Sequence, residues 1–163
     1  MDLHPLVIHY PIAFLTTYVV FELVRIRKIL ALPYWFHIKM TLVVIGELGA
    51  IATVITAQFS TELRGGNMLV DRYKLFIIIT ALIFGMLAFA YVFKFTDPNS
   101  DQSGQSRALT TWFHFILKPF VLIPLVITGL FFIIVSGGLF GATIYGTHFD
   151  PFLAPIFKLL KVY

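Results

Sequence analysis

Long apolar runs with few charges alternate with short polar stretches along the chain. A helix needs about 20 mostly apolar residues to cross a bilayer, and four runs satisfy this requirement, at about residues 6–23, 36–59, 75–93 and 112–138. The runs are continuous, whereas the strands of a membrane β-barrel alternate apolar and polar residues. The pattern therefore predicts an all-α integral membrane four-helix bundle, formed by residues 1–163 as a single domain.

The C-terminal part of the chain departs from this simple pattern. Residues 119–149 contain no Lys, Arg, Asp or Glu and exceed the length of one span, so we expect the glycine pair at 137–138 to end or bend the helix. Residues 150–163 combine apolar side chains with Lys158 and Lys161. This mixture predicts a short C-terminal interfacial helix rather than a fifth span.

The composition narrows the class of protein. Hydrophobic residues make up 59% of the 163 residues and charged residues 12%, about half the charged fraction of a soluble domain. This excludes a soluble enzyme, a disordered chain and a nucleic-acid-binding module. The absence of cysteine excludes disulfides, thiolate metal sites and covalently attached heme. No catalytic motif is present and the loops are short, so we expect a non-catalytic subunit in contact with the lipid bilayer.

The basic residues predict an orientation. The end of the bundle with the first and third loops carries Arg25, Arg27, Lys28, Lys39, Lys94, Arg107 and Lys118. The other end carries Arg64, Arg72, Lys74, Lys158 and Lys161. By the positive-inside rule the first end is cytoplasmic, which predicts a bacterial inner membrane protein with both termini on the non-cytoplasmic side.

Five histidines gather near the two predicted membrane faces. His37 and His114 lie near the starts of the second and fourth helices, which are diagonal neighbours in an up-down bundle. Two imidazoles facing each other across such a gap would supply both axial ligands to the iron of heme b. At the other face, His9 would pair with His148 or His4 in the same role. The alternative is that each histidine is an interfacial polar residue.

One acidic residue lies far from both predicted faces. Glu47 is near the middle of the second run, between Gly46 and Gly49, whose small size lets another helix approach closely. Its carboxyl could relay protons or bind a quinone or cofactor, or it could be a protonated acid bonded to a neighbouring helix. Glu22 lies three residues before Arg25, so we expect it to pair with Arg25 or reach the interface.

The opening of the chain resembles a known family. The run LHPLVIHYPIAFL is similar to the HPLLVHFPIAL-like start of the DUF2231 family of predicted bacterial membrane proteins, and His4, Pro5, His9, Pro11, Ile12 and Ala13 match in order. The segments GELGAIATVITA and GATIYGTHFDP resemble later parts of the family, whereas DRYKLF lacks the histidine that members often carry there. The resemblance implies an electron-transfer setting beside Rieske-type or cytochrome partners.

These observations lead to three hypotheses about function. The first is a b-type cytochrome-like electron-transfer subunit of a bacterial redox or energy-converting complex. The second is a cofactor-free accessory or structural subunit of a larger membrane complex. The third is a small ion or proton transporter subunit with Glu47 in its pathway. In each case the partners are the bilayer and other membrane or redox proteins, and no nucleic acid is expected.

Overall fold

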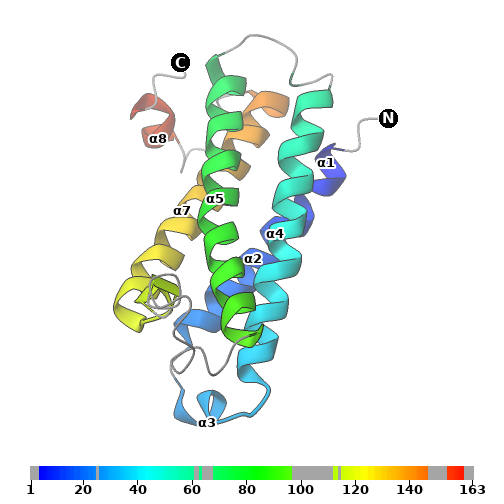
Figure 1. Ribbon diagram of the computed structural model, residues 1–163. Helices are drawn as coiled ribbons and strands as arrows, with labels where there is room; N and C mark the ends of the chain where they lie inside the picture. Colours follow the sequence, from blue (N-terminus) through cyan, green and yellow to red (C-terminus); the bar gives the residue numbers. More distant parts are fainter. Residues whose placement is uncertain are drawn as a thin grey trace.

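A computed structural model describes residues 4–24, 26–60, 63, 68–96, 112–113, 115–146 and 154–159 (Figure 1). Its helices are α1 (His4–Val7), α2 (His9–Leu23), α3 (Arg27–Leu30), α4 (Trp35–Phe59), α5 (Met68–Thr96), α7 (Pro119–Tyr145) and α8 (Ala154–Leu159). Within the described residues there is no strand, and four helical stretches are long and apolar enough to cross a membrane: α1 with α2, α4, α5 and α7. The predicted all-α four-helix bundle is therefore confirmed.

The long helices alternate in direction around a ring (Figure 1). Helix α2 packs against α4, α4 against α5, α5 against α7, and α7 against α2. The parallel helices α4 and α7 consequently lie diagonally across the bundle, as the sequence predicts. We call the end of the bundle at which α2 starts the α1 end, and the end that carries α3 the α3 end.

Helix α5 is longer than its apolar run. The sequence predicts a span at 75–93, whereas the helix begins seven residues earlier, at Met68, and ends at Thr96. Asp71, in the first turn of α5, is compatible with the positive end of the helix dipole. Charges in the terminal turns end the hydrophobic pattern but do not interrupt the backbone hydrogen bonds, so the helix continues beyond the predicted boundary.

Helix α7 differs from the predicted fourth span at both ends. Lys118 has an extended backbone, with ψ 137°, and Pro119 begins the helix. Proline suits this position because its missing N–H would have no partner in the first turn. At the other end the helix runs through the glycine pair at 137–138 and ends at Tyr145. Of the two predicted roles of this pair, ending the helix is therefore wrong, and bending it stays a prediction.

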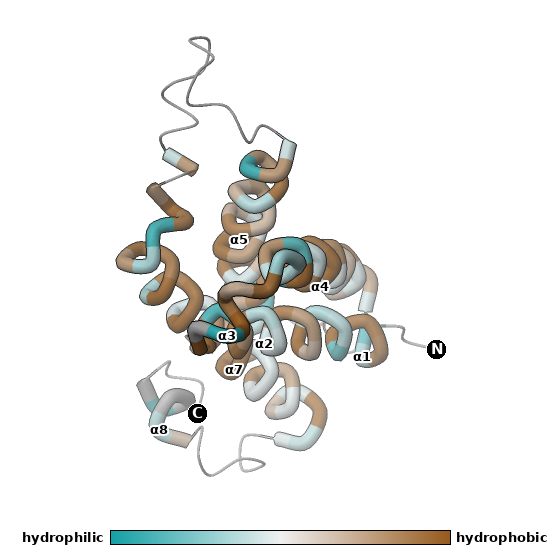
Figure 2. The backbone as a smooth tube through the Cα atoms, turned by 90° about the horizontal axis from the view of Figure 1, so that it is seen from below, coloured by the Kyte–Doolittle hydropathy of each residue, from teal (hydrophilic) through white to brown (hydrophobic). Residues whose placement is uncertain are grey.

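The centre of the bundle is filled with side chains. Buried residues from all four long helices meet there, among them Leu15, Tyr18, Val43, Phe84, Leu87 and Val126. Glycines permit this packing: a Cβ at Gly46 would lie 2.5 Å from Leu15 Cδ2, and one at Gly49 would lie 3.1 Å from Pro11 Cδ. The predicted close approach of another helix to this pair of glycines is confirmed, and that helix is α2. Hydrophobic residues dominate the long helices (Figure 2).

Candidate functional site

Glu47 lies halfway along α4, twelve residues from both Trp35 and Phe59. At 1.5 Å per residue this places it about 18 Å from either end of the helix. The residue is 8% exposed, and its Oε2 atom has no hydrogen-bond partner among the described residues. A polar atom without a partner is unfavourable at this depth because the hydrocarbon offers no water.

Glu47 lines a groove between α4 and α5 that has a volume of about 510 Å³. Apart from Glu47, the lining is apolar: Ile51, Val54 and Ile55 from α4, with Ile78, Ala81, Leu82, Gly85 and Met86 from α5. Leu82 is 68% exposed at this groove. Helix α2 packs against α4 and helix α7 against α5, and the exposed Leu82 at the groove shows that the groove opens on the outside of the bundle.

The α5 side of the groove contains two small residues one helical turn apart. Ala81 and Gly85 are four positions apart and both line the groove, the spacing that lets a second membrane helix approach closely. A Cβ at Gly85 would lie 3.1 Å from Glu47 Oε1. The spacing of Ala81 and Gly85 is visible in the sequence, but small residues are common in membrane helices. Only the structure shows that these two residues lie beside Glu47.

His4 is buried at the α1 end and joins three helices. Its Nδ1 lies 2.9 Å from Thr56 Oγ1, and its Nε2 lies 2.7 Å from the Tyr73 hydroxyl. The Thr56 hydroxyl donates its hydrogen to the Ala52 carbonyl, so it accepts the hydrogen of Nδ1–H. Tyr73 then donates to Nε2, which assigns a neutral imidazole. Both ring nitrogens are engaged, and neither is free to bind iron in this arrangement.

The other described histidines lie at opposite ends of the bundle. His9 is exposed at the α1 end, and its Nδ1 donates to the Pro5 carbonyl at 2.6 Å. His37 is exposed at the α3 end, with its ring 5.7 Å from those of Phe36 and Phe95. Two predicted second ligands, His148 for His9 and His114 for His37, lie outside the described residues. The alternative partner of His9 is His4, whose two ring nitrogens are hydrogen-bonded to Thr56 and Tyr73. The structure therefore brings neither predicted pair together in its described part.

A small cavity lies between the four long helices, α2, α4, α5 and α7. Its volume is about 30 Å³, and it lies beside Thr53, Thr80 and Ser136. This volume holds a water molecule but not a porphyrin. The hydroxyls beside it donate to carbonyls of their own helices. This cavity is therefore not a heme site.

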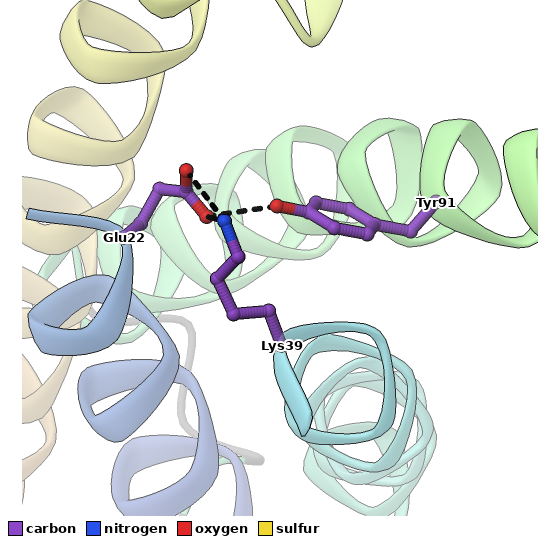
Figure 3. Close-up of polar contacts among 3 residues, drawn as sticks. All are labelled: Glu22, Lys39 and Tyr91. Atoms are coloured by element: carbon purple, nitrogen blue, oxygen red, sulfur yellow. Dashed lines mark hydrogen bonds and ion pairs between the residues drawn. The ribbon is translucent and has the colours of Figure 1, made fainter. Parts of the chain in front are cut away.

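A second buried acid lies at the α3 end. The Glu22 carboxylate accepts hydrogen bonds from Lys39, whose Nζ lies 2.8 Å from Oε2 and 3.1 Å from Oε1. It also accepts from the Tyr91 hydroxyl, 2.8 Å from Oε2 (Figure 3). The Glu22 side chain is 4% exposed and pairs with Lys39. Arg25, its expected partner, lies outside the described residues, and the expectation that Glu22 reaches the membrane interface stays a prediction. Sequence reasoning missed this network because its members come from three helices.

The fold and these sites define an all-α protein with four helices suited to cross a membrane among its described residues. Comparison with protein-family models, with curated proteins and with solved structures finds no match. The resemblance to the DUF2231 family accordingly stays a prediction. The interpretation of function therefore depends on the chemistry of the chain itself.

Proposed function

We propose that the chain is a non-catalytic accessory subunit of a larger membrane complex, and that the α4–α5 groove receives a transmembrane helix of a partner protein. The observation that carries this proposal is the Glu47 side chain, which lines the groove and whose buried Oε2 atom has no hydrogen-bond partner in the described chain. A hydroxyl or amide on the partner helix would supply the missing hydrogen bond.

The groove has the features of a helix-packing surface. Ala81 and Gly85 on the α5 side of the groove have little or no side chain, so the backbone of another helix can approach α5 closely. Exposed apolar side chains, including Ile55 and Leu82, flank the groove and supply packing area. The hydrogen bond to Glu47 adds direction to this packing, because in lipid the association of helices depends on close packing and interhelical hydrogen bonds.

Co-purification in mild detergent tests the proposal. Glu47→Gln keeps a group that donates and accepts hydrogen bonds, so the partner protein should be retained, whereas Glu47→Leu should lose it. Thr53→Val is the matched control, because Thr53 is a buried polar residue of α4 whose hydroxyl donates to the Gly49 carbonyl, away from the groove. Loss of the partner in Thr53→Val, or its retention in Glu47→Leu, contradicts the proposal.

Heme-dependent electron transfer is the second candidate, and the geometry of His9 favours it. Its Nδ1–H donates to the Pro5 carbonyl, which leaves Nε2 with a lone pair, the tautomer that metal-binding histidines adopt. A bound heme would supply reversible one-electron chemistry at the α1 end. This candidate predicts a b-type absorption spectrum that changes on reduction and is weakened by His9→Ala. A colourless protein from cells with ample heme contradicts it.

A further inference from the structure

We infer that the α3 end of the bundle contains a binding site for the phosphate group of an anionic phospholipid. The site is a cavity of about 170 Å³ to which α2, α4, α5 and α7 all contribute, and its polar lining consists of Glu22, Lys39, Tyr91 and Lys94. It is distinct from the α4–α5 groove, so this inference does not depend on the proposed function.

The charge of the cavity is positive. Lys39 and Lys94 contribute two positive charges and Glu22 one negative charge. The Glu22 carboxylate is already bonded to Lys39 and to the Tyr91 hydroxyl, so its charge is largely compensated. Lys94 is exposed, has no carboxylate partner among the described residues, and lies with Nζ 5.6 Å from the centre of the Phe36 ring. An anion in the cavity would therefore meet an uncompensated ammonium group.

The cavity also supplies hydrogen-bond donors. An ammonium group carries three N–H donors, and Glu22 occupies at most two of those of Lys39 through its two oxygens. Within the described part of the chain, Lys94 makes no hydrogen bond and its contact is with an aromatic ring, so all of its donors face no acceptor there. Phosphate oxygens accept such charge-assisted hydrogen bonds strongly.

The position and size of the cavity suit a lipid headgroup. Glu22 is the penultimate residue of α2, Lys39 lies in the second turn of α4, and Lys94 lies two residues before the end of α5. All three positions are at the helix ends, where headgroups meet a spanning protein. The volume is below the roughly 300 Å³ at which pockets for drug-sized molecules begin, so it matches a phosphate group.

The test uses purified full-length protein in neutral detergent, titrated separately with phosphatidylglycerol, phosphatidylcholine and inorganic phosphate. Native mass spectrometry measures the binding of each lipid. The thermal unfolding midpoint measures stabilisation by either lipid and by inorganic phosphate. We expect phosphatidylglycerol to bind most tightly. Lys94→Gln should weaken it about fivefold, the effect of about 1 kcal/mol for one basic residue near an anionic lipid, whereas Lys94→Arg should retain it.

The matched control is Lys28→Gln. Lys28 lies on α3 at the same end of the bundle, is exposed, and does not line the cavity. The affinity of the Lys28→Gln variant for phosphatidylglycerol should equal that of the unaltered protein. Equal losses in Lys28→Gln and Lys94→Gln overturn the site in favour of general surface charge. If phosphatidylcholine binds as tightly as phosphatidylglycerol, the site is not selective for an anionic lipid and the inference is overturned. If inorganic phosphate raises the unfolding midpoint as much as phosphatidylglycerol does, the ligand is free phosphate rather than a lipid.

Discussion

Gly85 on α5 lies directly against the carboxyl group of Glu47 on α4. A methyl group at position 85 would lie 3.1 Å from Oε1 and 3.5 Å from the carboxyl carbon of Glu47. The absence of a side chain at Gly85 thus leaves the space that the acid occupies, and it keeps the α4–α5 groove open beside it. Glu47 and the groove consequently depend on each other, and changes at either residue should alter what the groove binds.

The first prediction concerns this contact. Gly85→Leu should displace the Glu47 carboxyl and fill the groove, so that co-purification of the partner protein falls at least about tenfold, the effect of about 1.4 kcal/mol. Met86→Leu is the control, because it preserves volume at a neighbouring groove residue. Quantitative immunoblotting of the purified complexes measures both. An unchanged partner yield in Gly85→Leu contradicts the proposed docking face.

The second prediction concerns the buried histidine. His4 and Tyr73 share a 2.7 Å hydrogen bond between α1 and α5, so removing both should cost less than the sum of the single losses. We expect a coupling energy between about 0.6 kcal/mol, the average for interhelical hydrogen bonds in a membrane protein, and about 1.7 kcal/mol, the largest such value. A double-mutant cycle with His4→Ala and Tyr73→Phe, read by unfolding in mixed detergent micelles, measures this energy. Strictly additive effects would show that the bond contributes nothing.

The third prediction concerns the ion pair at the α3 end. The Glu22 and Lys39 side chains are 4% and 13% exposed, and removing one partner leaves the other as an uncompensated buried charge. Lys39→Met should lower the free energy of unfolding by about 3–5 kcal/mol, and the double variant Glu22→Gln with Lys39→Met should recover part of the loss. Lys28→Met, which changes an exposed lysine of α3, should have little effect. A double variant less stable than Lys39→Met rules out this account of the pair.

The fourth prediction compares two glycines of α7. A Cβ at Gly129 would lie 2.7 Å from the Phe84 ring, whereas one at Gly137 would meet only Ile12 Cδ1, at 3.9 Å. Gly129→Ala should therefore destabilise the bundle by about 1–3 kcal/mol through overpacking. Gly137→Ala should not destabilise it, because alanine also favours the helix. Thermal unfolding of both variants in the same detergent distinguishes these effects, and equal midpoints are incompatible with the packing described.

Much of the fold could be predicted from the sequence because length and hydropathy alone identify a membrane span. The glycines around Glu47 also indicated correctly that another helix packs there, and α2 fills that position. The ends of the helices were harder to predict from the sequence. Asp71 lies inside α5 although it precedes the apolar run at 75–93, and the glycine pair at 137–138 lies inside α7.

The partners of the polar residues could not be predicted for a physical reason. In a membrane helix the lipid-facing and core-facing sides are both apolar, so the hydrophobic pattern does not indicate how the helix is rotated. Glu22 and Lys39 come from different helices, and only the packing of α2 against α4 brings them together. His4 resembled an interfacial residue or a ligand in the sequence, yet it is buried with both ring nitrogens hydrogen-bonded.

Photocrosslinking from inside the groove tests the central claim most directly. A photoreactive amino acid at Leu82, which is 68% exposed in the groove, should form an adduct with one membrane protein in intact cells. The same amino acid at Ile127, which is 51% exposed on α7, should not form it, and Glu47→Leu should abolish it. Equal adducts from both positions, adducts with lipid alone, or an adduct of two copies of this chain would contradict a partner helix in the α4–α5 groove.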